Sequence, residues 1–245
     1  MSTRRAKQLI YGALYLLIVL VVCGLAYLVF VLPSTLKPVV LCTPSTCAPT
    51  STAPILMGPT QMFVTSPGHY SFVAQATDRS SDYGSAALDY ALDLDDASGT
   101  VLQSIPERTF IYPTQGRYLM VLNQAIAQPF DHAALVVTGV SWLASSTIGP
   151  IPAVAPGQFA LQNIQTGVAS ATVSVGGQLV NTGVVSFEQV FVVVTFDDSM
   201  GNPIGVSQTE LDNVRAGTTN SFSVIYPNIP NINPALNQII VYALR

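Results

Sequence analysis

The stretch LDYALDLDDASGTVL, from Leu88 to Leu102, has the pattern of a strand, a tight turn and a second strand. Apolar and polar residues alternate up to Asp95, as in a strand with one buried face. Asp95 and Asp96 then start a turn, and Gly99 supplies the positive φ angle of a bulge. The stretch therefore predicts a β-hairpin.

The same pattern returns in VFVVVTFDDSMGNPIG, from Val190 to Gly205. Two aspartates and a glycine recur at a constant spacing of 102 residues (197 − 95): Asp95, Asp96 and Gly99 match Asp197, Asp198 and Gly201. A calcium site built from these aspartates and Asp93 is the alternative, because Ca²⁺ binds carboxylate and carbonyl oxygens. Neither stretch has the D-x-D-x-D-G spacing with a following Glu, so we interpret both as hairpin turns and expect no metal.

Flanking segments extend the repeat on both sides of the hairpins. The matching pairs are Ser71–Gly84 with Thr172–Val185, Thr109–Asn123 with Leu211–Tyr226, and Ala133–Leu143 with Asn237–Leu244. Each half then holds about six or seven short strands, which is typical of an immunoglobulin-like antiparallel sandwich. We predict an all-β body with one sandwich over residues 61–147 and a second over 158–245. The proline-rich stretch 148–157 is the predicted linker.

The N-terminal part predicts a membrane anchor. Residues 9–32 contain no charge, and a helix of that length spans roughly 36 Å, enough for a hydrocarbon core of about 30 Å. A cleaved signal has an apolar region of only about 7–15 residues and a small-x-small site after it. Arg4, Arg5 and Lys7 precede the span and Lys37 follows it. This balance predicts residues 1–8 in the cytoplasm and the body outside the plasma membrane.

Residues 33–60 are rich in Pro, Ser and Thr, and we interpret them as a stalk. Cys42 and Cys47 lie within it, and outside the cytoplasm this pair is expected to close a small disulfide loop. Free thiols are the alternative. A zinc site would need further ligands, and the two histidines, His69 and His132, are far apart in the chain.

The charge balance argues against nucleic-acid binding. Beyond Lys7 the chain has six basic and thirteen acidic residues, a formal balance of −7 (6 − 13). Phosphate contacts need clustered Lys and Arg, which this body lacks. We expect membrane lipid around the N-terminal helix and an unidentified protein of the cell envelope as partners.

No pattern for catalysis stands out in the sequence. There is no G-x-S-x-G motif, no phosphate-binding G-x-x-x-x-G-K loop, and only the adjacent Asp131 and His132 pair an acid with an imidazole. We therefore expect no cofactor and no enzymatic activity, and we place any binding surface on loops 123–133 and 227–237. The aromatic residues in strand patterns are expected to be mostly buried: Phe72, Tyr90, Phe110, Tyr118, Trp142, Phe191, Phe196, Phe222 and Tyr242.

The turn and strand residues of both halves also support a resemblance. The first half contains Asp82-Tyr83-Gly84, Asp95-Asp96-x-x-Gly99, Thr109-Phe110-Ile111-x-Pro113 and Arg117-Tyr118; the second contains Asn181-Thr182-Gly183 and Phe191-x-Val193-x-x-Phe196-Asp197. This order resembles small bacterial single-pass proteins with tandem immunoglobulin-like domains of the FxLYD or late-embryogenesis-abundant type. The Leu-Tyr-Asp triplet of the FxLYD signature is missing here. The resemblance implies a structural or interaction module at the cell surface and no catalytic residues.

Two other functions remain as alternatives. A pilin-like filament subunit also combines an N-terminal apolar helix with a β-rich head, but its processed N-terminus commonly has a Glu at the fifth position, and no acid precedes Asp78. A substrate-binding or accessory enzyme domain would need a polar pocket that the sequence does not reveal.

Overall fold

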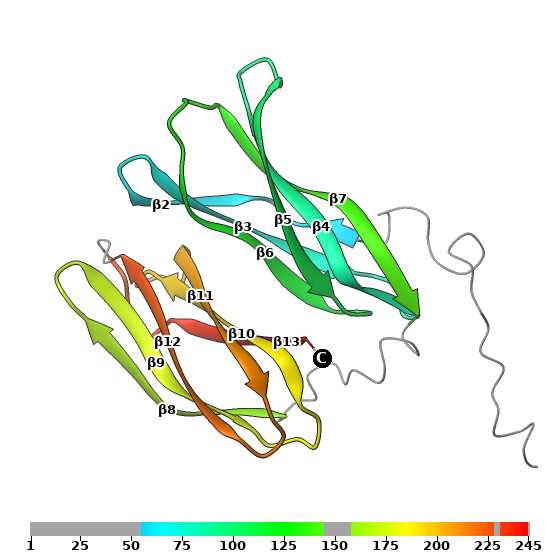
Figure 1. Ribbon diagram of the computed structural model, residues 1–245. Coiled ribbons are helices and arrows are strands. Elements are labelled where there is room, and N and C mark those ends of the chain that lie inside the picture. Colours follow the sequence, from blue (N-terminus) through cyan, green and yellow to red (C-terminus); the bar gives the residue numbers. More distant parts are fainter. Residues whose placement is uncertain (1–54, 145–157, 228–230, 245) are drawn as a thin grey trace, which may run out of the picture. The chain divides into compact units, whose positions relative to one another are not determined.

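The computed structural model describes residues 55–144, 158–227 and 231–244, and its regular elements there are all β-strands (Figure 1). Every pairing between these strands is antiparallel, which confirms the predicted all-β class. Within this part of the chain, no helix long and apolar enough to cross a membrane is found. The predicted anchor 9–32, Cys42, Cys47 and the linker 148–157 lie outside the described residues.

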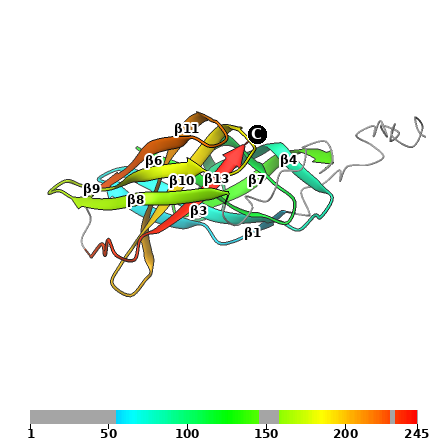
Figure 2. The same ribbon diagram turned by 90° about the horizontal axis from the view of Figure 1, so that it is seen from below.

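The first half of the body consists of two sheets. One contains β1 (Ile55–Met57), β2 (Gln61–Ser66), β3 (His69–Asp78) and β6 (Gly116–Ala125), with β3 at its centre. The other contains β4 (Tyr83–Asp95), β5 (Val101–Ile111) and β7 (His132–Ala144), with β4 at its centre. Figure 2 shows the same strands from below.

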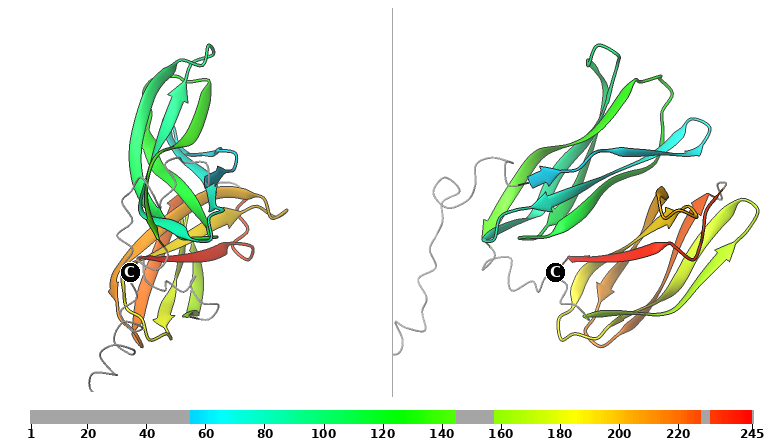
Figure 3. Two further views of the ribbon diagram at one scale, coloured as in Figure 1. Left: turned by 90° about the vertical axis from the view of Figure 1, so that its right-hand side faces the viewer. Right: turned by 180° about the vertical axis from the view of Figure 1, so that it is seen from behind.

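The second half repeats this pairing. One sheet has β9 (Thr172–Asn181) between β8 (Phe159–Val168) and β12 (Thr219–Pro227). The other has β10 (Phe187–Asp197) between β11 (Pro203–Val214) and β13 (Gln238–Leu244). The strands β8 to β13 therefore pair as β2 to β7 do, and in each half the strands form two layers (Figure 3).

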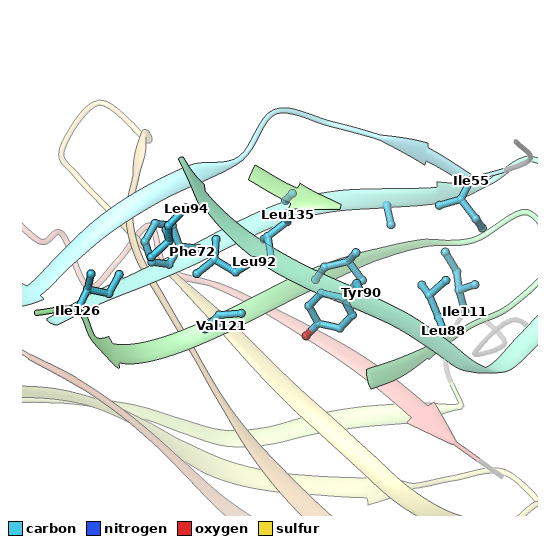
Figure 4. Close-up of a cluster of buried hydrophobic side chains, with 13 residues drawn as sticks. Ile55, Phe72, Leu88, Tyr90, Leu92, Leu94, Ile111, Val121, Ile126 and Leu135 are labelled. Carbon is cyan, nitrogen blue, oxygen red and sulfur yellow. The ribbon is translucent and has the colours of Figure 1, made fainter. Parts of the chain in front are cut away.

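Each half has its own hydrophobic core between its two sheets. In the first half, Phe72 from β3 lies beside Leu92 and Leu94 from β4, and Leu88 lies farther along the same core (Figure 4). In the second half, the core combines side chains of β9, β10 and β12, such as Val175, Val192 and Tyr226. Alternating apolar positions fill these cores because successive side chains of a strand point to opposite faces.

The first sheet begins earlier than the sequence predicted. Ile55 lies in the range 33–60 assigned to the stalk, yet β1 pairs with the end of β3, and Ile55 is buried in the first core. Pro54 before this strand and Gly58-Pro59 after it resemble the proline-rich stretch upstream. A strand of three residues is too short to show an alternating pattern, so composition alone could not separate it from the stalk.

Candidate functional site

The two predicted hairpin turns have the same geometry. In the first, the Asp96 Oδ1 accepts hydrogen bonds from the N–H groups of Ser98 (2.8 Å) and Thr100 (2.9 Å). The N–H of Gly99 donates to the Asp96 carbonyl at 3.0 Å, and Gly99 has φ = 81°. Hydrogen bonds from the Ser98 hydroxyl and from these amides lower the pKa of Asp96.

In the second hairpin, the Asp198 Oδ1 accepts from the N–H groups of Met200 (2.8 Å) and Asn202 (2.9 Å). Gly201 also has φ = 81°, and its N–H donates to the Asp198 carbonyl at 3.0 Å. Hydrogen bonds from Asn202 are the main reason that the pKa of Asp198 is lowered. In both turns the carboxylate of the second aspartate thus accepts hydrogen bonds from backbone N–H groups of the same turn.

The first aspartate of each pair differs between the halves. Asp95 is half-buried at the end of β4, whereas Asp197 is buried at the end of β10, where burial raises its pKa. The Asp197 Oδ2 accepts a hydrogen bond from the Gln238 Nε2 at 3.4 Å. Over the described residues, no group of three or more His, Cys, Asp or Glu is placed to hold a metal ion.

The two candidate binding loops are attached to these hairpins in the same way. The N–H of Asp131 donates to the Asp95 carbonyl at 2.8 Å, and the N–H of Asn233 donates to the Asp197 carbonyl at 2.8 Å. In each half, the hairpin and the loop before the last strand therefore lie at the same end. They form one composite edge at each of these two ends.

Among the residues that the structure describes, neither histidine makes a hydrogen bond to a Ser or Thr hydroxyl. The Nδ1 of His69 lies 3.3 Å from the Pro67 carbonyl, and His132 is exposed at the start of β7. The backbone of His132 is opposite Asp95 in the β4–β7 pair. Across the described part of the chain, no ion pair joins His132 to a carboxylate; the ion pair there is Arg108 with Asp89 at 2.6 Å.

The strongest chemical feature in the described body is Arg117, at the beginning of β6. Its side chain is 5% exposed and lies among three aromatic rings. The guanidinium carbon is 3.8 Å from the ring centroid of Phe110, 4.7 Å from that of Tyr242 and 5.0 Å from that of Phe191. Phe110 comes from the first half, and the other two rings come from the second. A cation over aromatic faces is stabilised by the ring quadrupoles.

The guanidinium lacks a conventional partner within the described residues. Its Nε and Nη1 atoms are buried and make no hydrogen bond to this part of the chain. Burial lowers the pKa of Arg117 to about 10, against smaller opposing effects of Tyr242, Tyr90 and Tyr112. Arg117 therefore remains a cation at neutral pH, in a place where a buried charge is normally paired with an anion.

An apolar contact joins the two halves beside Arg117. Phe63, Val73 and Met120 from the first half pack with Val193 and Val206 from the second. In addition, the N–H of Tyr118 donates to the phenolic oxygen of Tyr242 at 3.2 Å. Two neighbouring residues of β6 thus contact the same tyrosine of β13.

A cavity of about 570 Å³ lies beside Arg117. Arg117 forms part of its wall. Apolar side chains, among them Met120, Leu122 and Phe191, form another part. Its polar lining includes Glu107, Arg108, Thr109, Gln189 and Gln208. The volume lies in the range of pockets that bind small molecules, about 300–1,000 Å³.

Sequence reasoning did not identify Arg117 as a site residue, although one signal for it exists. Arg117, Leu119 and Val121 occupy alternate positions of β6, and all three are buried. A cation in the buried register of a strand, in a body with few basic residues, marks a position that needs a special environment. The expectation that the strand aromatics are mostly buried holds for five of the nine, whereas Tyr118, Trp142, Phe191 and Tyr242 are half-buried. Of these, Tyr118, Phe191 and Tyr242 face the contact between the halves.

Comparison with models of protein families gives no match, and comparison with curated proteins gives none either. The function of the chain is therefore inferred from its sequence and from the geometry of the described residues.

Proposed function

We propose that the chain is a single-pass protein of the plasma membrane, anchored by residues 9–32, with residues 1–8 in the cytoplasm. Its body then acts outside the cytoplasm as a non-enzymatic structural or protein-interaction module of the cell envelope. The uncharged N-terminal run and the basic residues before it support the anchor and its orientation. The resemblance to small anchored bacterial proteins with tandem immunoglobulin-like domains supports the same proposal.

The observation behind this proposal is that the two halves of the body repeat the same strand pairing and contact each other. Strands β8–β13 pair as β2–β7 do, which supports two immunoglobulin-like sandwiches, the first over residues 55–147 once β1 is included and the second over 158–245. The contacts of Arg117 and Tyr118 with Tyr242 connect the two halves. Such a body suits a role in which loops are presented to a partner outside the membrane. In this proposal residues 33–54 are the stalk that remains once β1 is assigned to the first sheet, and Cys42–Cys47 is a disulfide within it.

The composite edges made by hairpin and loop are the surfaces we assign to the partner. Ala235 and Gln128 are exposed in the two loops, and both loops are tied to their hairpins by backbone hydrogen bonds. Loops held by a β-framework bind partners without a large ordering cost. The two ends then offer related surfaces to a protein of the envelope.

Photo-cross-linking in intact cells tests this proposal. A benzophenone amino acid replaces Gln128 or Ala235 in the loops, and Gln103, exposed on β5, is the matched control position. We expect one or a few discrete adducts from the loop positions and none of the same mass from position 103. Absence of adducts from both loops, or identical adducts from all three positions, would contradict the proposal.

A second candidate function is supported by the cavity beside Arg117. A body with a pocket of this volume and a buried cation in its wall also suits a substrate-binding domain. In that case the envelope module recognises a small molecule in addition to a protein.

A further inference from the structure

Arg117 presents donors that its aromatic neighbours do not satisfy. The rings of Phe110, Tyr242 and Phe191 stabilise the positive charge of the guanidinium by cation–π contacts. These rings accept no hydrogen bonds from its N–H groups, which point outward in the guanidinium plane. Nε and Nη1 have no acceptor among the described residues. Leaving donors of a charged group unpaired in a buried place costs free energy, which an added oxygen acceptor would offset. Both atoms are themselves buried, so an acceptor from outside the chain reaches them only after a shift of the side chains around the guanidinium.

The charged side chains around the cavity indicate which kind of anion it binds. Arg108 also lines the cavity, but its Nε is 2.6 Å from Asp89 Oδ1, so its charge is already compensated. Glu107 contributes a carboxylate to the same lining. One unpaired cation near one carboxylate favours a ligand with a single negative charge, because a doubly charged phosphate would be repelled by Glu107.

The uncharged side chains that line the cavity indicate the chemistry of the rest of the ligand. Phe191, Met120 and Leu122 supply apolar surface, and Thr109, Gln189 and Gln208 supply neutral hydrogen-bonding groups. An arginine recognises a carboxylate through paired N–H donors, and apolar walls accept a hydrocarbon or aromatic body.

We propose that this cavity binds a small organic monocarboxylate, whose carboxylate is held by Arg117 and whose apolar part rests against Phe191, Met120 and Leu122. Bound ligand then contacts β6 of the first half and β10 of the second, and so stabilises the contact between them. The site is independent of the membrane topology and of the protein partner at the composite edges.

Calorimetric titration of the full-length protein in detergent tests this site with defined probes. Benzoate and hexanoate are compared with their neutral amides, benzamide and hexanamide, and with inorganic phosphate. We expect saturable binding of at least one carboxylate, at least tenfold tighter than binding of its amide. No saturable binding of either carboxylate, equal binding of the amides, or preferred binding of phosphate would each overturn the proposal.

Two variants identify the location of any binding that is seen. Gln208→Glu adds a carboxylate to the cavity lining, and Gln103→Glu adds one to an exposed strand position outside that lining. We expect Gln208→Glu to weaken carboxylate binding at least tenfold and Gln103→Glu to leave it unchanged, with wild-type unfolding midpoints in both. Arg117→Met is expected to abolish binding. Carboxylate binding that survives both Gln208→Glu and Arg117→Met would place the ligand elsewhere and overturn the assignment.

Discussion

The N–H of Tyr118 donates a hydrogen bond to the phenolic oxygen of Tyr242, 3.2 Å away and 124 positions later in the chain. Burial is the main reason that the pKa of Tyr242 is raised, so this phenol stays neutral at physiological pH. The same ring contacts Arg117, the residue before Tyr118. Because both contacts connect β6 to β13, we expect the two halves of the body to unfold together.

Shortening Arg117 should destabilise the body far more than neutralising it. Arg117→Ala removes the stem and the cation from among three rings and leaves a cavity, which we expect to cost about 2–4 kcal/mol. Arg117→Met keeps most of the volume and removes two unpaired donors, so its stability should stay within about 1 kcal/mol of wild type. Urea unfolding measures both. Equal losses in the two variants would mean that the charge, and not the packing, stabilises this contact.

Deprotonation of Asp78 should lower the free energy of unfolding of the body as pH rises from 5 to 7. Burial raises the pKa of Asp78 to about 6, against the Ser80 amide, which donates to its Oδ1 at 2.8 Å. In the unfolded chain a carboxyl group has a pKa near 3.9. Because the folded value is higher, the protonated form stabilises the fold. This stabilisation is complete below about pH 3.9 and is lost as pH rises through about 6.

The equivalent position in the second half suggests the test variant. Asn181 is buried at the end of β9 as Asp78 is at the end of β3, and its Nδ2 donates to the Val185 carbonyl at 2.8 Å. Asp78→Asn should raise stability at pH 7 and shrink the difference in urea midpoint between pH 5 and pH 7. Asp82→Asn, at an exposed position of the following turn, should keep the wild-type difference. An unchanged difference in Asp78→Asn would show that Asp78 does not titrate in this range.

Position 205 on β11 needs a glycine because the ring of Tyr226 leaves no room for a side chain. A Cβ at this position would lie 2.4 Å from ring carbons of Tyr226, which is buried and stacks on Phe196 at a centroid distance of 4.8 Å. We expect Gly205→Ala to cost about 1–3 kcal/mol in thermal or urea unfolding. The control is Gly139→Ala on β7, where the nearest atom is Asp89 Oδ2 at 3.4 Å and the cost should be below about 0.5 kcal/mol. Similar losses in both variants would contradict this packing.

Replacing either hairpin glycine should cost the same free energy of unfolding, because the two glycines have the same backbone geometry. Gly99 and Gly201 share φ = 81°, and no atom lies within 4 Å of a Cβ built on either one. Replacing each glycine by alanine should therefore cost about 1 kcal/mol through backbone strain alone. Unfolding midpoints of Gly99→Ala and Gly201→Ala measure this. A cost confined to one of them would mean that the two turns are not true repeats.

Local chemistry explains which elements could be predicted from the sequence. The hairpins at Asp96 and Asp198 follow from an aspartate and a glycine three positions apart (99 − 96 and 201 − 198), and the strands beside them follow from alternation over about five to ten residues. The spacing of 102 residues between the hairpins then locates the corresponding strands of the second half. All of this information lies within short segments of the chain.

Non-local packing explains what the sequence did not reveal. Arg117 is stabilised by Phe110, seven positions away, and by Phe191 and Tyr242, 74 and 125 positions away (191 − 117 and 242 − 117). Alternation indicates that one face of a strand is buried, but it does not indicate that the other face meets a second sheet. The contact of Val73 and Met120 with Val193, and the cavity beside it, therefore could not be inferred from the pattern of either half.

The most direct test of the proposed membrane-anchored module combines protease accessibility of intact cells with the intact mass of the membrane-extracted protein. We predict that protease added outside removes the body and that the mass of untreated protein includes residues 1–32. A mass that begins after residue 32, or a body that is protected until the cells are broken, would contradict the retained anchor and its orientation.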